Sequence, residues 1–310
     1  MTIKEQWVEY IYSLQDHICS ALEAEDGKAT FREDIWERPE GGGGRTRVIA
    51  NGNVFEKGGV NVSAVSGVVT DAMRSQLKLP TQFANQPLSW FACGLSLVLH
   101  PYSPLVPTVH CNYRMFELYD ERGHVIDRWF GGGTDLTPYY LIDEDAIHFH
   151  QTYKTVCDQF DADFYPTFKK HCDEYFVNFH RNNERRGIGG IFYDYQRATE
   201  NKDVDFWVSF GKACGYALTT SYIPIVATRK NLPFTAEQKH WQEIRRGRYT
   251  EFNLVHDRGT LFGLKTNGRI ESILMSLPPT VRFEYDYQPA KGREEDRLLQ
   301  ACLKPIDWIN

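Results

Sequence analysis

The chain has 310 residues, 42% of them hydrophobic and 14% aromatic, with a formal net charge of -6. This length and composition allow a large core, and the absence of linkers, repeats and low-complexity tracts favours a single domain over residues 1–310. The acidic balance excludes general attraction to nucleic acid or anionic membranes, so local arginines must bind any anionic ligand.

The cysteines and the amino-terminal segment bear on the compartment. The seven cysteines are odd in number, scattered and without a CxxC pair, which excludes a disulfide framework and a zinc ribbon. They are predicted to be reduced thiols in the core. The amino-terminal MTIKEQWVEY lacks the apolar core of a signal peptide, and no apolar run reaches transmembrane length. We therefore expect a cytoplasmic protein with no integral membrane contact.

The first half of the chain predicts one helix followed by strands. Apolar residues at helical spacing predict a helix from residue 2 to about residue 25, closing near Gly27. The stretch 41–67 is rich in Gly, Val and Asn and predicts strands joined by turns. Further strands are predicted at 93–100, from 108 onward and at 125–130.

The second half predicts helices and then a second set of strands. One helix is expected from Asp143 to about Phe160, and the next has Pro166 in its first turn and ends near Gly187. Two more helices are expected after Asp205 and after Thr235, a good N-cap. Residues 249–275 are predicted to form an antiparallel ladder, with turns at Arg258-Gly259 and Asn267-Gly268. This order indicates an α+β fold with a mostly antiparallel sheet.

The segment HPYSPLVPTVHCNYR contains a polar stripe. His110, Asn112 and Arg114 are two apart, so they share one face if the segment is a strand. The opposite, core-facing side would hold four alternating residues, Val109, Cys111, Tyr113 and Met115. Such a pattern is typical of a binding surface and equally of any half-exposed strand.

The glycine tracts do not indicate a nucleotide site. Neither GGGG at 41–44 nor GGG at 131–133 matches GxGxxG or continues into GK[ST] and a helix. The first tract leads into Arg45 and Arg47 at same-face strand spacing, which suits carboxylate binding. A solvated strand face explains the two arginines equally well.

The histidines and one aspartate are candidate reactive groups. His100, His110, His148, His150 and His180 could converge on a metal ion, although no HExxH or other short-range ligand pair is present. The alternative is that they act as hydrogen-bonding or acid–base groups. Asp257 stands among arginines in the segment 245–269, where it would stay ionised and accept hydrogen bonds from a ligand. An ordinary Asp-Arg-Gly turn is the competing interpretation.

Several long motifs, in order from about residue 30 to the KPIDWI near the carboxyl end, resemble the oxygen-dependent coproporphyrinogen III oxidase family. They are FREDIWERPEGGGGRTRVIANGNVFEKGGVNVSAVSG, LSLVLHPYSPLVPTVHCNYRMFE, WFGGGTDLTPYYL, YPTFKKHCDEYF, HRNNERRGIGGIFYDY and RGRYTEFNLVHDRGTLFGLKTNGRIESILMSLPP.

This resemblance implies a large, flat antiparallel sheet covered by helices on both faces, and a homodimer joined through about residues 249–284. It implies oxidative decarboxylation of two propionates of coproporphyrinogen III to vinyl groups, giving protoporphyrinogen IX in haem biosynthesis. Molecular oxygen is the co-substrate, no organic cofactor is needed, and a divalent metal ion is left open.

The resemblance also implies roles for individual residues. His110 and Asp257 are the expected catalytic groups, the first as proton donor and the second facing the pyrrole nitrogens. The expected substrate-binding residues are Ser96, Asn112, Tyr113, Arg114, Arg258, Asn267, Gly268 and Arg269. The family's proposed metal positions correspond to His100, His110, His150 and His180.

Two other classes of function remain compatible with the residues. A non-catalytic tetrapyrrole carrier would use the same pocket, arginines and aromatic content, and a turnover assay separates it from the enzyme. A histidine–metal hydrolase would cleave esters or phosphates without oxygen, but no local ligand motif supports it.

Overall fold

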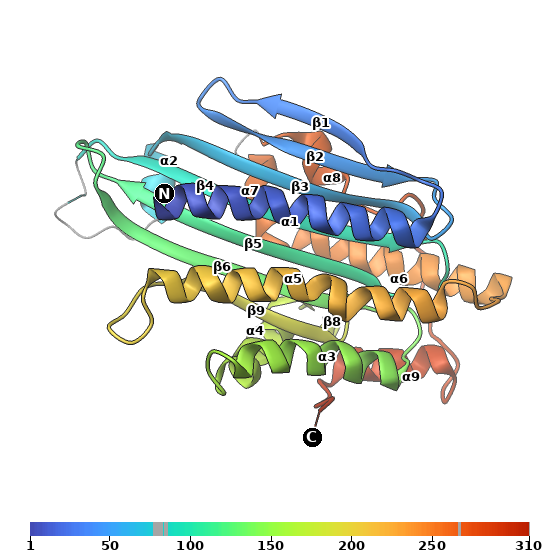
Figure 1. The fold of residues 1–310 in the computed structure, drawn as a ribbon. Helices are drawn as coiled ribbons and strands as arrows, with labels where there is room; N and C mark the ends of the chain where they lie inside the picture. The colour runs from blue at the N-terminus through green and yellow to red at the C-terminus, as the bar shows by residue number, and fades with distance from the viewer. Residues whose placement is uncertain (77–82, 84–85, 266–267, 310) are drawn as a thin grey trace.

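The computed structural model describes residues 1–76, 83, 86–265 and 268–309. A central antiparallel sheet carries helices on both faces, which confirms the predicted α+β class (Figure 1). Its elements are α1 (Ile3–Asp26), β1 (Arg32–Glu37), β2 (Gly42–Ala50), β3 (Phe55–Val68), α2 (Asp71–Gln76), β4 (Ser89–Pro101), β5 (Thr108–Tyr119), β6 (Val125–Thr137), α3 (Asp143–Asp158), α4 (Phe164–Tyr175), β7 (Val177–Asn178), β8 (Glu184–Arg185), β9 (Gly189–Gln196), α5 (Val204–Arg229), α6 (Ala236–Val255), α7 (Arg258–Lys265), α8 (Ile270–Leu274) and α9 (Glu294–Leu303).

The main sheet is a meander extended by one later strand. Among the described residues it has seven strands in the order β1-β2-β3-β4-β5-β6-β9, and every neighbouring pair is antiparallel. Antiparallel neighbours need only short connections, which is why the first six strands follow one another along the chain. Helices α3 and α4 lie between β6 and the last strand, β9.

One face of the sheet is covered by α1 and α5, which pack against each other and against the central strands (Figure 1). Helix α1 forms as predicted because its apolar residues recur at helical spacing and both of its ends are capped. Thr2 and Glu5 form a capping box at the start, and Gly27 ends the helix in the left-handed conformation with φ 71°. The buried side of α1 joins the main hydrophobic core.

The carboxylate of Asp26, the last residue of α1, connects this helix to the turn between β2 and β3. Its two oxygens accept hydrogen bonds from the backbone N–H groups of Ala29, Asn53, Val54 and Phe55 at 2.9–3.1 Å. Burial alone would raise the pKa of Asp26, but these donors outweigh burial and hold the pKa below its ordinary value.

The opposite face of the sheet lies under α6, α7 and α8 (Figure 1). Polar side chains of the sheet contact this helical layer. Thr46 Oγ1 lies 2.9 Å from Ser272 Oγ, and Asn61 Nδ2 donates to the carbonyl oxygen of Ser272 at 2.9 Å. No residue of α8 is fully buried. Helix α8 is therefore held to the sheet mainly by polar contacts, whereas α6 also buries apolar residues such as Trp241 and Phe252. We call the sheet surface beneath this layer the polar face.

Most predicted elements are confirmed, but two predictions are wrong. The second of the tandem helices ends at Tyr175 instead of near Gly187, because the short β7–β8 hairpin follows it. The ladder predicted for 249–275 is helical: it contains the end of α6, all of α7 and α8. Of the two turns predicted there, Arg258-Gly259 starts α7, and Asn267 lies outside the described residues.

Two predictions about bulk properties can also be compared with the structure. All seven cysteines are buried and free, as expected for core thiols. In the described part of the chain, no helix combines the length and the apolar content that crossing a membrane requires.

Candidate active site

The predicted polar stripe exists, and the sheet pairs it with neighbouring polar residues. Residues 108–119 form β5, and the register places Ser96 of β4 opposite Asn112. Directly opposed residues of an antiparallel pair project to the same side, so Ser96, His110, Asn112 and Arg114 all lie on the polar face. The stripe is therefore covered by the α6–α8 layer.

Tyr113 is the exception among the expected substrate-binding residues. Its side chain is fully buried in the main core on the other side of the sheet, where its hydroxyl lies 2.7 Å from Thr134 Oγ1. Only its backbone could contact a ligand on the polar face.

Arg114 is held in place by its neighbours yet remains partly accessible. Its Nη1 donates to Asn112 Oδ1 at 2.6 Å, and its Nη2 lies 2.9 Å from Asp194 Oδ2, while its side chain is 30% exposed. Gly131 of β6 lies opposite Arg114, and a Cβ atom at Gly131 would lie 2.7 Å from Asp194 Oδ1 and 3.1 Å from Arg114 Nε. A partly exposed, preoriented guanidinium is suited to a carboxylate ligand.

His110 is the unusual group of this site, because it is buried and its one close polar partner is the carboxylate of Asp135. Its Nδ1 lies 3.3 Å from Asp135 Oδ2, and its Nε2 has no hydrogen-bond partner among the described residues. The imidazole stacks on the ring of Tyr249, with centroids 5.1 Å apart. Buried polar groups in native proteins are almost always paired, so the Nε2 atom is available to a ligand or water on the polar face.

The charges around His110 set its protonation state. Burial, and after it the guanidinium of Arg186, lower the pKa of His110, while Asp135 and Asp257 oppose this shift. Burial would raise the pKa of Asp135, but Arg186 and His110 hold it below its ordinary value. The Nη2 of Arg186 donates to both oxygens of Asp135, at 2.9 and 2.7 Å. His110 is therefore neutral at neutral pH beside an ionised Asp135.

Asp257 lies between α6 and α7 and has a structural role of its own. Its Oδ2 accepts from the backbone N–H of Thr260 at 2.7 Å and from Thr260 Oγ1 at 2.8 Å, so Asp257 caps α7. The hydroxyl of Tyr175 donates to Asp257 Oδ1 at 3.2 Å, and the guanidinium of Arg258 lies 4.6 Å above the Tyr175 ring. The charge of Asp257 acts on His110, which places the two candidate catalytic groups in one electrostatic environment.

Three further residues predicted to contact substrate, Asn267, Gly268 and Arg269, lie between α7 and α8 in the chain. Arg269 is the N-cap of α8 and forms an ion pair with Asp34 of β1. Gly268 donates its N–H to the carbonyl oxygen of Gly263 at 2.8 Å, and Asn267 lies outside the described residues.

Arg45 and Arg47 lie on the other side of the sheet, toward α1. Arg45 Nη2 and Arg47 Nη1 each lie 2.7 Å from Asp16 Oδ1, and both arginines also pair with Glu33. The carboxylates that they bind therefore belong to the protein, and they are not part of the polar face.

The four histidines of the expected metal site do not come together. His150 on α3 is bonded to the Tyr165 hydroxyl at 2.9 Å and to the Ile188 carbonyl oxygen at 3.2 Å, and its pKa is lowered to about 3, chiefly by burial. His180 is partly exposed and contacts Glu251 and His256. No cluster of three or more His, Cys, Asp or Glu side chains in the described residues could hold a metal ion. The residues present thus do not fit a shared metal centre.

Sequence reasoning missed several residues of this site, namely Asp135, Tyr175, Arg186, Asp194 and Tyr249. Asp135 follows the GGG tract within a motif already noted, but only the register shows that it lies directly opposite His110. The sequence pattern predicts a strand at Tyr249, whereas its place on α6 brings its ring over His110. Sequence spacing alone gives no signal for contacts between separate elements.

Comparisons with known proteins give one consistent result. Residues 6–308 match the model of the family described as coproporphyrinogen III oxidase. The chain is 52% identical to the oxygen-dependent coproporphyrinogen-III oxidase, chloroplastic, of Glycine max, over 99% of this chain and 80% of the relative. It is 50% identical to coproporphyrinogen-III oxidase 1, chloroplastic, of Arabidopsis thaliana over the same shares, and 53% identical to the Nicotiana tabacum enzyme over 95% and 75%.

Proposed function

The chain belongs to the coproporphyrinogen III oxidase family, and we propose that its polar face binds coproporphyrinogen III and performs the oxygen-dependent decarboxylation that gives protoporphyrinogen IX. The supporting observation is the gathering of His110, Asn112 and Arg114 on one sheet face, with Asp257 close enough to act on His110. Domain 1–310 is proposed to act as one unit in this reaction.

The electron balance explains why no organic cofactor is required. For each propionate, the bond to the carboxylate breaks, carbon dioxide leaves, and the β-carbon loses one hydrogen as a proton. The two electrons released reduce molecular oxygen, which takes up two protons and leaves as hydrogen peroxide. Since the substrate supplies the electrons, a flavin or nicotinamide has no step to perform.

Arginines and amides on the polar face are proposed to bind the substrate. Arg114 binds one propionate, and Ser96 and Asn112 add hydrogen bonds beside it. Arg258 and Arg269 bind further carboxylates, so replacing both should mainly weaken affinity. Unchanged substrate binding by the double variant would count against this role.

Asp257 and His110 are proposed to move the protons. Asp257 accepts a pyrrole N–H, and removal of that proton makes the ring electron-rich enough to reduce oxygen. His110 is neutral, because burial and Arg186 lower its pKa, so it can deliver a proton to reduced oxygen only after it has taken one. A neutral imidazole near Asp257 suits such a transfer.

The experiment that tests the activity is product formation from coproporphyrinogen III in air, after exhaustive chelation and a metal assay of the protein. Protoporphyrinogen formation by metal-free protein supports the cofactor-free reaction. Activity that is lost and then restored by a divalent ion would instead make metal part of the reaction. A protein that binds the tetrapyrrole without any turnover would be the carrier.

The homodimer is a further proposal. Residues 249–284 include several exposed apolar side chains that a partner subunit would cover, namely Leu254, Val255, Leu264, Ile270 and Phe283. Sedimentation of the protein over a range of concentrations checks this, and replacing Val255 with Asp should favour the monomer. A monomer at every concentration would contradict it.

The compartment is also kept as a proposal. We propose the cytoplasm, whereas the names of the relatives from Glycine max and Arabidopsis thaliana place those proteins in the chloroplast. Fractionation of the source cells decides between the two.

A further inference from the structure

His100 is fully buried near the end of β4, and both of its ring nitrogens are used. Its Nε2 lies 2.8 Å from the carbonyl oxygen of Ser276, and its Nδ1 lies 3.4 Å from Thr108 Oγ1. The ring also makes an edge contact with Tyr249, with centroids 5.1 Å apart. His100 therefore joins the sheet to the layer that covers the polar face.

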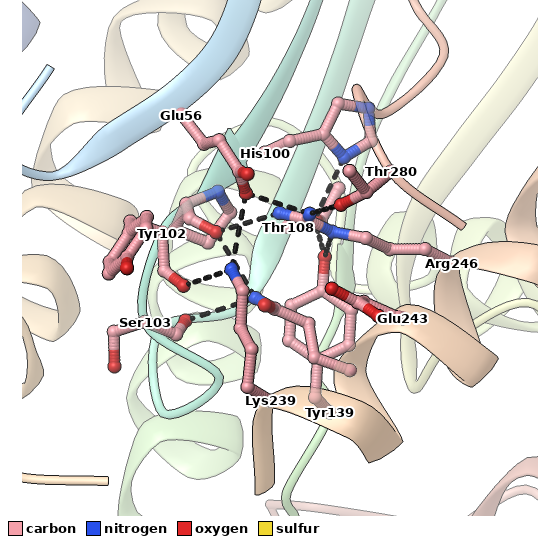
Figure 2. Close-up of polar contacts among 12 residues, drawn as sticks. Glu56, His100, Tyr102, Ser103, Thr108, Tyr139, Lys239, Glu243, Arg246 and Thr280 are labelled. Carbon is pink, nitrogen blue, oxygen red and sulfur yellow. Dashed lines mark hydrogen bonds and ion pairs between the residues drawn. The ribbon is translucent and has the colours of Figure 1, made fainter. Parts of the chain in front are cut away.

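The two ends of the hydrogen-bond chain fix its direction. A carbonyl oxygen only accepts, so Nε2 of His100 carries the proton and Nδ1 must accept one from Thr108. The Tyr139 hydroxyl, 2.7 Å from Thr108 Oγ1, then donates to Thr108. At the far end Arg246 Nε can only donate, and it lies 3.4 Å from the Tyr139 hydroxyl (Figure 2). A single placement of the protons therefore satisfies every hydrogen bond from Arg246 through Tyr139 and Thr108 to His100.

Arg246, at the far end of this series of hydrogen bonds, is itself fixed by other partners. Arg246 is fully buried, and it donates from Nη1 to Glu56 Oε2 at 2.8 Å and from Nη2 to the carbonyl oxygen of Pro101 at 2.9 Å (Figure 2). Burial, and after it the positive charge of Arg246, keep the pKa of His100 well below its ordinary value. The imidazole is therefore neutral, with no free lone pair to offer a metal ion.

The segment that His100 contacts, residues 272–277, is also anchored at Ser272 by Thr46 and Asn61 and at Met275, which is buried beside Val98 and Tyr249. The Ser276 carbonyl also accepts from the Tyr249 hydroxyl at 3.1 Å, and Lys57 Nζ donates to the carbonyl oxygen of Leu277 at 2.8 Å. Helix α8, which leads into this segment from Arg269, has no fully buried residue. Hydrogen bonds from the sheet and α6 to the backbone carbonyls of Ser272, Ser276 and Leu277 thus act beside the apolar contact of Met275.

We propose that His100 is a positioning residue: as a neutral Nε2–H donor, it docks residues 272–277 onto the polar face and holds Tyr249 against His110. This assigns His100 to the substrate pocket without a metal ion. The effect on catalysis rests on the proposed function, whereas the effect on residues 272–277 does not.

Two substitutions at His100 separate positioning from metal binding. In His100→Gln the amide nitrogen can reach the Ser276 carbonyl, although an amide is a poor ligand for transition metals. His100→Leu keeps the bulk and removes the donor. Val109→Ala is the matched control, because Val109 is the neighbour of Thr108 on the opposite, core face.

Hydrogen exchange of the backbone amides of residues 270–280 is the first measurement, and substrate KM and kcat are the second. We expect His100→Leu to speed exchange in this segment by about tenfold, the equivalent of one hydrogen bond, and to raise KM more than it lowers kcat. His100→Gln should restore both values most of the way. Val109→Ala should leave exchange in the segment unchanged.

The outcome that overturns the proposal is equally specific. The positioning role is refuted if hydrogen exchange in residues 270–280 is unchanged in His100→Leu. It is also refuted if His100→Gln is as inactive as His100→Leu and both variants lose a stoichiometric divalent metal. Thr108→Val provides an independent variant should His100→Leu fail to fold, and it should speed exchange to a smaller extent. If the wild-type protein shows no turnover, the proposed function fails while the exchange result still decides the positioning role.

Discussion

The two faces of the sheet differ in how they are covered. On the α1 and α5 face, large side chains such as Trp7, Tyr113 and Phe210 are fully buried. Each such side chain stabilises the fold by about 1.5–3 kcal/mol. On the polar face, hydrogen bonds worth about 0.5–1.5 kcal/mol each connect the sheet to α8 and the residues after it. Large apolar side chains thus cover the α1 and α5 face throughout, whereas on the polar face they come from α6, and α8 is held mainly by hydrogen bonds.

The large core behind β5 can offset the cost of leaving His110 Nε2 without a hydrogen-bond partner. An unsatisfied buried polar group costs about 1–3 kcal/mol, a large part of the about 5–15 kcal/mol by which a domain is stable. Here the apolar layer behind β5 offsets the cost. The same strand therefore contributes to the core with one set of side chains and to the site with the alternate set.

The largest expected effect comes from removing the charge of Asp257 while keeping its cap. Asn is an equally good N-cap, so Asp257→Asn should leave the unfolding temperature nearly unchanged and lower turnover by about 10²–10⁴-fold, as loss of a general base does. Asp257→Ala should in addition lose about 0.5–2 kcal/mol of stability with the cap of α7. Steady-state kinetics with thermal unfolding check this, and normal turnover in Asp257→Asn would refute the role.

On the α1 and α5 face, a substitution is expected to lower stability and to leave turnover unchanged. Trp7 is fully buried, packs edge-on to Phe130 and donates its Nε1–H to the carbonyl oxygen of Cys93 at 3.1 Å. Trp7→Ala should lower the free energy of unfolding by about 3–5 kcal/mol and leave the kcat of the folded fraction unchanged. Urea unfolding followed alongside activity measures both. A large fall in kcat at full folding would break the proposed division between the faces.

Arg114 tests affinity on the polar face. Arg114→Ala removes a hydrogen-bonded charge worth about 1.5–3 kcal/mol, which corresponds to a rise in KM of roughly ten- to a hundredfold. Arg114→Lys should be intermediate, because lysine keeps the charge and loses the planar fork. If neither variant changes KM, the propionate lies elsewhere.

The link from α1 to the sheet predicts a pH dependence of stability. Since the folded-state pKa of Asp26 is lowered, its carboxylate contributes stability at pH values above its unfolded pKa of about 3.9, and this is lost as the pH falls through the folded pKa. Asp26→Asn should be less stable than the wild type at neutral pH, and the difference should shrink in acid. Thermal unfolding between neutral and acid pH measures it, with a constant difference as the contrary result.

The smallest effect is expected at Tyr175. Tyr175→Phe removes one hydrogen bond to Asp257 and keeps the ring stacked on Phe192, whose centroid is 4.5 Å away. We expect kcat to fall by no more than about tenfold, with stability unchanged. A hundredfold loss would give the tyrosine hydroxyl a direct part in the reaction.

The elements differ in how well their secondary structure could be predicted from the sequence. Helix α1 and strand β5 could be predicted because periodic apolar residues report burial directly. The end of α6 could not, because its helical spacing, with Trp241, Ile244 and Tyr249 buried on one side, emerges only when the pattern is followed from the cap at Thr235. Read from Tyr249 onward, the segment resembles strands.

At the candidate site, the sequence indicated His110, Asn112 and Arg114 of the polar stripe, but it did not indicate the residues of other elements that contact them. Asp135 and Arg186 act on His110 through strand register and a hairpin, neither of which has a local sequence signature. The prediction that four histidines share a metal ion also depended on contacts between separate elements that the sequence does not show. Residue type shows which groups can bind metal, whereas convergence depends on how distant elements pack.

The glycine opposite Arg114 has a consequence for inherited variation. Gly131 takes no part in binding or proton transfer, yet a single added methyl group there would meet both Asp194 and the guanidinium of Arg114. A Gly131→Ala allele would preserve every charge and every reactive group in the chain, yet its methyl group would press on Asp194 and on Arg114, the cation proposed to bind a propionate. Scores that rank variants by chemical similarity would class such an allele as benign.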